Sequence, residues 1–154
     1  MKIEEKIQSL GYALPPVPKP VAAYVPWVRT GSLVFTAGQI PLADGVLKYR
    51  GKVGGELTIE QGYEAARLCT LNALAAIKAA VGDLDRVSRI VKVVVFVNSA
   101  PGFTDQPKVA NGASEFLANV FGEAGQHARS AVGVSDLPLG SACEVELIAE
   151  VSGT

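Results

Sequence analysis

The sequence has few of the residues that most often carry chemistry. Its 154 residues include one histidine, two cysteines and one methionine. These counts exclude a metal cluster built from several histidines or cysteines, and a scaffold held by several disulfides. Charged residues make up 19% of the chain, and 14 Lys+Arg against 15 Asp+Glu give a net charge of −1. Because no positive excess is available to neutralise phosphates, we expect no nucleic-acid partner.

Long apolar segments are also missing. The longest strongly apolar run covers residues 93–97, whereas a transmembrane helix needs about 20 such residues. Residues 1–10 mix charges of both signs and lack the apolar core of a secretory signal. We therefore expect a cytoplasmic protein without a membrane partner, in which Cys69 and Cys143 are reduced, buried side chains.

Hydrophobic residues, in contrast, make up 49% of the chain. A chain of this length forms one domain and buries roughly two thirds of its unfolded surface. The remainder faces water, so the low charge content indicates that part of it is covered in an oligomer. We expect a single domain over residues 1–154, in which residues 1–20 form a short helix and a proline-rich lead-in.

Hydrophobic periodicity predicts an α+β fold of order β-β-β-α-β-α-β-β. A capping box of Thr58 and Gln61 begins the first main helix, which ends at Gly82. The second covers residues 107–121, and an N-terminal amphipathic helix covers residues 3–10. The predicted strands are residues 23–29, 33–37, 46–53, 86–98, 128–134 and 143–151. With both main helices on one face of the sheet, the other face remains partly apolar and needs a partner subunit.

Polar side chains of interest lie on the last two predicted strands. Strand alternation places His127, Arg129 and Ala131 on one face of the first. The small neighbours leave room above Arg129, whose guanidinium offers paired hydrogen bonds to a carboxylate or phosphate. An acidic partner across the sheet or at an interface is an equally good interpretation. Glu144 shares one face of the final strand with two other acids; such acids are usually solvated, although one beside Arg129 could activate water.

Two other polar residues have a structural and a functional interpretation. His127 is either an acid, base or hydrogen-bond donor to a substrate, or a histidine at the rim of the site, and we favour the rim. Asn111-Gly112 interrupts a helical pattern with two poor helix formers. Close packing between helices is the preferred explanation, and a polar contact is the alternative.

Several segments together resemble one known family. The resemblance is carried by the segments TAGQIP (36–41), VVVFVNS (93–99) and ARSAVGVSDLPLGSACEVELIAEV (128–151). Through them the chain resembles the Rid proteins, which are the YjgF-like reactive intermediate deaminases. The resemblance covers residues 21–151, and NGASEF, VFGEAG and HARSAVGV resemble a divergent subgroup of this length. It implies a chorismate-mutase-like fold and a homotrimer with a central barrel-like core and clefts between subunits. It also implies hydrolysis of 2-enamino and 2-imino acids to 2-oxo acids and ammonia, without metal or cofactor.

The resemblance assigns roles to individual residues. Arg129 matches the arginine that binds the substrate carboxylate, and Glu144 matches the glutamate that holds or activates the attacking water. Gly38 matches a glycine beside the substrate in a loop at a strand end. Tyr24 matches a tyrosine that closes over the cleft, and Asn111 an asparagine at its edge.

The sequence also departs from the family pattern at three positions. Ala37 replaces a serine, Ala131 replaces a cysteine, and His127 stands where a proline is usual. We expect these three positions to be among the substrate-binding residues, and we expect the substrate to differ from that of the well-defined deaminases. An alternative is a trimer that binds a carboxylate metabolite without turnover. RNA cleavage, a label carried by some relatives, is disfavoured by the single histidine and the absence of basic excess.

Overall fold

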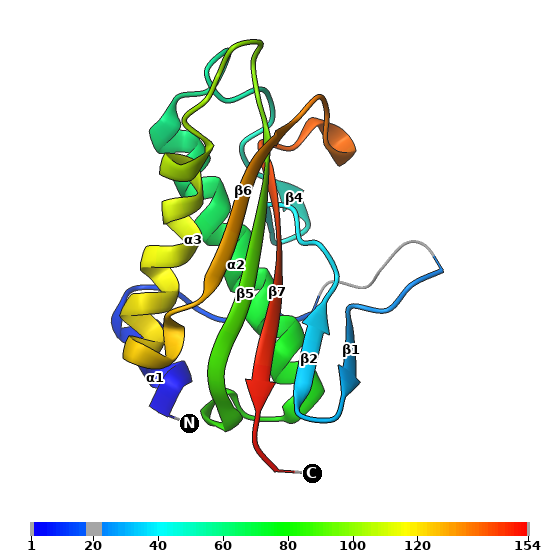
Figure 1. Ribbon diagram of the computed structural model, residues 1–154, viewed down its shortest axis with the longest axis vertical. Helices are drawn as coiled ribbons and strands as arrows, with labels where there is room; N and C mark the ends of the chain where they lie inside the picture. The colour runs from blue at the N-terminus through cyan, green and yellow to red at the C-terminus, as the bar shows by residue number, and fades with distance from the viewer. Residues whose placement is uncertain (1, 18–22, 154) are drawn as a thin grey trace.

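A computed structural model describes residues 2–17 and 23–153; Pro18 and Pro20 of the expected lead-in lie outside these ranges. Two long helices cover one face of a mixed sheet (Figure 1). The sheet order is β1 (Trp27–Thr30), β2 (Leu33–Thr36), β7 (Cys143–Val151), β5 (Val87–Asn98) and β6 (Ala128–Val134). Within this sheet of the described residues, the β5–β6 pair is parallel and the other three pairs are antiparallel. The helices are α1 (Lys2–Ser9), α2 (Ile59–Val81) and α3 (Gln106–Phe121), with 3₁₀ turns at Leu84–Arg86, Gly122–Gly125 and Pro138–Gly140.

The expected capping of α2 is confirmed. The Thr58 hydroxyl accepts a hydrogen bond from the Gln61 backbone amide at 3.1 Å, and the Gln61 side chain accepts one from the Thr58 amide at 2.9 Å. At the other end, Gly82 has a φ of 86° and donates to the Lys78 carbonyl. A left-handed backbone of this kind favours glycine, which explains why the helix ends there.

The strand expected at residues 46–53 is present only at its start. β4 (Val46–Leu47) pairs with β3 (Leu42–Ala43) in a separate two-stranded sheet, and Arg50 and Val53 form isolated bridges. Asp44 and Gly45, with φ of 53° and 75°, form the two-residue turn between β3 and β4. Tyr49 also has a positive φ, of 58°, and therefore ends the extended backbone soon after β4. The first strand is likewise shorter than expected, because β1 begins only after Pro26.

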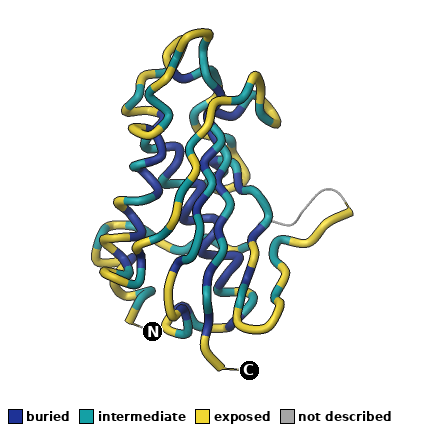
Figure 2. The backbone as a smooth tube through the Cα atoms, viewed as in Figure 1, coloured by how far each residue is buried: buried dark blue, intermediate teal, exposed yellow. Residues whose placement is uncertain are grey.

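The core lies between the helices and the sheet, as the buried segments in Figure 2 show. Alternate residues of β5 and β7, among them Val95 and Leu147, are almost completely buried beneath α2 and α3. The two helices approach closely at Gly112, where an added Cβ would lie 2.0 Å from the Tyr63 carbonyl oxygen. Close helix packing is therefore the reason for the glycine in α3. Cys69 and Cys143 are buried free thiols, as expected.

The opposite face of the sheet is open and carries apolar side chains. Val28 is 54% exposed, Phe35 39% and Val132 45%. Val28 and Phe35 are paired across β1 and β2, and Phe35 is paired with Ile148 of β7. The expected apolar face opposite the helices is thus present. Among the described helices, none combines the length and apolar character that crossing a bilayer requires.

Candidate functional site

Arg129 lies on β6 and reaches the neighbouring helix α3. Its Nη1 donates to Asn111 Oδ1 at 2.9 Å and to Ser114 Oγ at 3.1 Å. Both partners are neutral, and no carboxylate within residues 2–17 and 23–153 forms an ion pair with this guanidinium. The Nη2 and Nε donors have no hydrogen-bond partner among the same residues. The arrangement holds the guanidinium in place and leaves donors for a planar anion.

His127 contacts Ser114, one of the two partners of Arg129. Its Nδ1 lies 2.6 Å from the Gly125 carbonyl oxygen and its Nε2 lies 2.8 Å from Ser114 Oγ. Because a carbonyl only accepts, the proton is on Nδ1, and in the neutral ring Nε2 accepts from the Ser114 hydroxyl. Ser114 thereby connects His127 with Arg129. A pocket of about 330 Å³ opens beside these three side chains. Arg129, Asn111, Ser114 and His127 form what we call the arginine group.

Glu144 lies at the start of β7 beside Gly38, which follows β2. Gln39 and Val145 exchange backbone hydrogen bonds of 2.8 and 3.0 Å, and this pairing brings Gly38 against the Glu144 side chain. An added Cβ at Gly38 would lie 2.4 Å from Glu144 Oε2. Burial raises the pKa of Glu144, and the charge of Glu146 raises it further. Glu144 and Gly38 form what we call the glutamate group.

The arginine group and the glutamate group lie on opposite faces of the sheet. Arg129 is in register with Val93, and Val93 with Leu147, both buried beneath the helices. Glu144 is instead in register with Phe96, and Phe96 with the exposed Val132. The β-sheet itself therefore separates the two groups within one chain.

The remaining candidates lie in two regions of the chain. Ala131 lies two residues after Arg129 on the helix-facing side, in register with the buried Val95. Ala37 directly precedes Gly38, and its amide donates to the Pro26 carbonyl at 2.9 Å. Tyr24 is 52% exposed ahead of β1. Asn111 joins the arginine group, whereas Tyr24 and Ala37 lie in the segments that flank β1 and β2.

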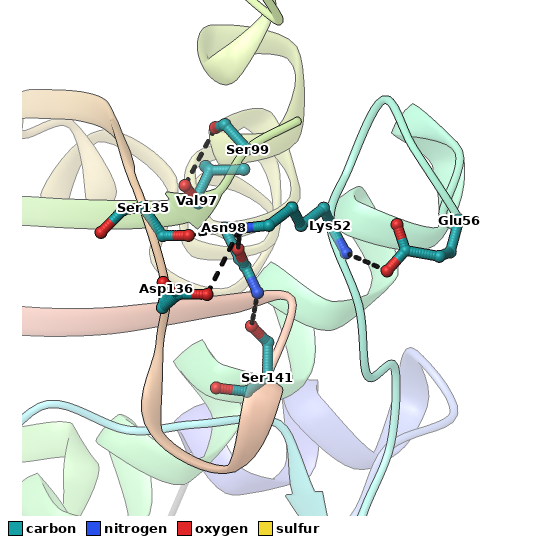
Figure 3. A network of polar contacts seen from close by, with 8 residues as sticks. All are labelled: Lys52, Glu56, Val97, Asn98, Ser99, Ser135, Asp136 and Ser141. Carbon is teal, nitrogen blue, oxygen red and sulfur yellow. Dashed lines mark hydrogen bonds and ion pairs between the residues drawn. The ribbon is translucent and has the colours of Figure 1, made fainter. Parts of the chain in front are cut away.

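Lys52 was not among the candidates from sequence. Figure 3 shows its ammonium between the end of β5 and the β6–β7 loop, where it donates to Asn98 Oδ1 at 2.8 Å and to the Ser135 carbonyl. Asp136 Oδ1 lies 3.5 Å from the same ammonium, and Asn98 in turn donates to the Ser141 carbonyl at 3.1 Å. The network fixes the loop that joins β6 to β7. Since its members are far apart in the chain, sequence spacing carried no signal for it.

Metal binding has no support in the described ranges, where no group of three or more histidine, cysteine or acidic side chains is placed to hold an ion. Arg129 offers donors for an anion, and Glu144 offers a carboxyl group for proton transfer.

The chain is similar to known proteins over nearly its whole length. Residues 4–151 match the family described as "YjgF/chorismate_mutase-like, putative endoribonuclease". Protein TCP17 of Trypanosoma cruzi is 45% identical over 152 residues, which cover 98% of this chain and 95% of that protein. A 2-iminobutanoate/2-iminopropanoate deaminase of Dermatophagoides farinae is 29% identical, with 87% and 90% of the two chains covered. The crystal structure of Atu1372 from Agrobacterium tumefaciens superimposes with a TM-score of 0.93 at 40% identity, covering 98% of this chain and 93% of the other.

Proposed function

The chain belongs to the YjgF/chorismate-mutase-like family, and from that premise we propose that it hydrolyses small 2-imino or 2-enamino acids to 2-oxo acids and ammonia. The reaction uses no metal or cofactor, and it takes place in clefts between the subunits of a homotrimer. The observation that carries the proposal is Arg129, a guanidinium held by neutral side chains beside a pocket.

Arg129 suits the carboxylate that every such substrate carries. A buried or half-buried arginine is usually paired with an acid in its own protein, but Asn111 and Ser114 satisfy Nη1 without neutralising the charge. An incoming carboxylate then pairs with the Nη2 and Nε donors in the planar fork geometry that arginine favours. The clamp fixes the orientation of the adjacent C2 atom, at which the reaction takes place.

Glu144 suits the water half of the reaction. Water adds to C2 of the protonated imine while Glu144 accepts one of its protons. The same carboxyl group then returns the proton to nitrogen. As the C2–N bond breaks and ammonia leaves, the Glu144 carboxylate accepts the proton of the C2 hydroxyl, so that the carbonyl group of the 2-oxo acid forms. That proton then passes from Glu144 to the released ammonia or to water. The raised pKa of Glu144, caused by burial and then by Glu146, makes it a stronger base than a solvated carboxylate.

The opposite placement of the two groups favours a site between chains. No rotation of side chains brings Arg129 and Glu144 together through the sheet, whereas the open face of one chain can meet the α3–β6 edge of another. The exposed Val28, Phe35 and Val132 give that open face the apolar character of an interface. Ala37 and Ala131 offer no polar side chain to a substrate, so its orientation depends mainly on Arg129.

Subunit complementation tests the proposal. Arg129→Ala and Glu144→Gln chains with different tags are expressed separately and together, and 2-oxo acid release from 2-aminoacrylate generated in situ is measured. Each variant alone should be nearly inactive. In mixed trimers about one quarter of the sites combine an intact arginine group with an intact glutamate group, so about one quarter of the wild-type rate should return.

The other outcomes are equally informative. No recovery in purified mixed oligomers would contradict a site shared between chains. A wild-type rate equal to the uncatalysed hydrolysis would contradict the enzymatic proposal. In that case, an Arg129-dependent increase in melting temperature with pyruvate would favour the carboxylate-binding alternative.

A further inference from the structure

A second cavity lies in the helical layer, apart from the arginine group and the glutamate group. Its volume is about 340 Å³, within the range of small-molecule sites. Tyr12 enters it from the segment after α1, Lys48 and Tyr49 from the segment after β4, and Phe116 from α3. Residues of α2 complete the lining. None of these residues borders the pocket beside Arg129.

The walls of the cavity are aromatic and aliphatic. The Tyr12 ring meets the buried Phe116 ring edge to face, with centroids 5.5 Å apart and an interplanar angle of 86°. Leu68 and Leu71 line the cavity from α2, three residues apart and thus on one helical face. Aromatic walls of this kind bind a flat apolar ring through edge and face contacts.

The charges at the cavity leave one positive group for a ligand. Arg67 forms a two-pronged ion pair with Glu64 one turn earlier in α2, and its guanidinium lies 4.6 Å from the centre of the Tyr12 ring. These contacts neutralise Arg67 locally. Lys48 is exposed at the rim, and no described carboxylate pairs with it. The cavity therefore combines an apolar interior with one positive charge at its opening.

Tyr49 adds an independent observation. Its φ of 58° lies in the left-handed region, which is unfavourable for a bulky side chain. The conformation is held in place, because the Tyr49 carbonyl accepts a hydrogen bond from the Ala142 amide at 3.0 Å. A glycine would adopt the same backbone without strain. The strained tyrosine lines the cavity, and strain of this kind concentrates at binding sites.

We propose that this cavity binds a small carboxylate whose body is an aromatic ring. The ring lies among Tyr12, Tyr49 and Phe116, and the carboxylate pairs with Lys48. The site differs from the proposed catalytic site in position and in ligand. Ser114 of the arginine group and Phe116 are two residues apart on α3 and point about 200° apart around the helix. The proposed assembly uses the open face of the sheet and the side of α3 that carries Ser114. The cavity lies on the opposite side of α3, against α2, and therefore remains accessible.

Binding of 3-phenylpropanoate to the assembled full-length protein, measured by calorimetry in an Arg129→Ala background, tests the proposal. That background removes the other carboxylate site, so failure of the proposed deaminase function does not affect the result. We expect saturable binding of about one molecule per chain. Lys48→Gln should weaken it about fourfold, as expected for loss of one exposed ion pair. The neutral 3-phenylpropan-1-ol should bind more weakly than the acid and be insensitive to Lys48→Gln.

Two further variants complete the design. Lys6→Gln, which removes an exposed lysine of α1, is the charge-matched control and should leave the affinity unchanged. Leu68→Trp should fill the cavity and abolish binding of both the acid and the alcohol. If Leu68→Trp fails to fold, the affinities of the two surface variants, Lys48→Gln and Lys6→Gln, still test the proposal. Absence of saturable binding, equal binding of acid and alcohol, or equal effects of the two lysine variants would overturn the proposal.

Discussion

Replacement of Gly38 by alanine separates the function of the glutamate group from the stability of the fold. The new Cβ would lie 2.4 Å from Oε2, 2.8 Å from Cδ and 3.1 Å from Cγ of Glu144. Gly38 does not have a positive φ, so alanine fits its backbone. The atoms it meets belong to the end of a flexible, half-buried side chain. The Glu144 carboxylate therefore moves away, and the backbone stays in place.

The size of that movement gives the expected loss of activity. Ordinary carbon–oxygen contact begins at about 3.4 Å, so the carboxylate oxygen has to move by at least about 1 Å. A displacement of about 1 Å at a reacting group costs about 100-fold in rate. This corresponds to about 2.7 kcal/mol in the activation free energy. The free energy of unfolding should change by less than about 1 kcal/mol, because no backbone contact is compressed.

The assay compares kcat/KM for a 2-imino acid generated in situ with the melting temperature of the same preparation. Gly55→Ala is the matched control, since Gly55 is exposed and the nearest atoms to its added Cβ lie at 3.4 and 3.5 Å, a contact that needs no rearrangement. Gly38→Ala should be about 100-fold slower with an unchanged melting temperature, and Gly55→Ala should match wild type in both. Wild-type kcat/KM in Gly38→Ala would refute the role assigned to Glu144.

Three further predictions concern stability. Burial raises the pKa of Glu144 in the folded protein, and the charge of Glu146 raises it further. Protonation of Glu144 therefore stabilises the folded state, and this stabilisation is lost as the pH rises through the folded-state pKa. Glu144→Gln should therefore melt higher than wild type at about pH 7.5 and similarly at about pH 4, and equal melting at both pH values would contradict this. Gly112→Ala should cost about 3 kcal/mol in urea unfolding, because its Cβ would lie 2.0 Å from the Tyr63 carbonyl oxygen; a loss below about 1 kcal/mol would show that the helices separate easily. Lys52→Met should cost about 2 kcal/mol and speed proteolysis within residues 135–141, since the ammonium holds that loop; an unchanged cleavage rate would argue against this role.

The sequence predicted the elements whose signals are local. The capping box at Thr58 and the stop at Gly82 gave the bounds of α2, and both are confirmed. The strand expected at residues 46–53 ends at Leu47, because the positive φ of Tyr49 interrupts the extended backbone that the β-forming composition favours. That conformation depends on a hydrogen bond to Ala142, far along the chain, and no local pattern encodes it.

Alternation within a strand predicted that Arg129 and Ala131 share a face, and the register agrees. It could not relate that face to the one that carries Glu144, because the relation depends on how β5 pairs with both β6 and β7. Ser114 was missed for a similar reason. A serine inside a helix has no distinguishing pattern, and only the packing of α3 on β6 places its hydroxyl between His127 and Arg129.

The separation of Arg129 from Glu144 also bears on the kind of assembly. A two-fold interface uses one patch on both partners, and a single patch cannot contain two groups that lie on opposite faces of a sheet. A shared site therefore needs two different surfaces to meet, the α3–β6 edge of one chain and the open face of the next. Contacts of that kind form a ring where the rotation between subunits closes, and an open filament where it does not. The shared site that we propose therefore requires a ring, and a fully active two-fold dimer would contradict the proposal.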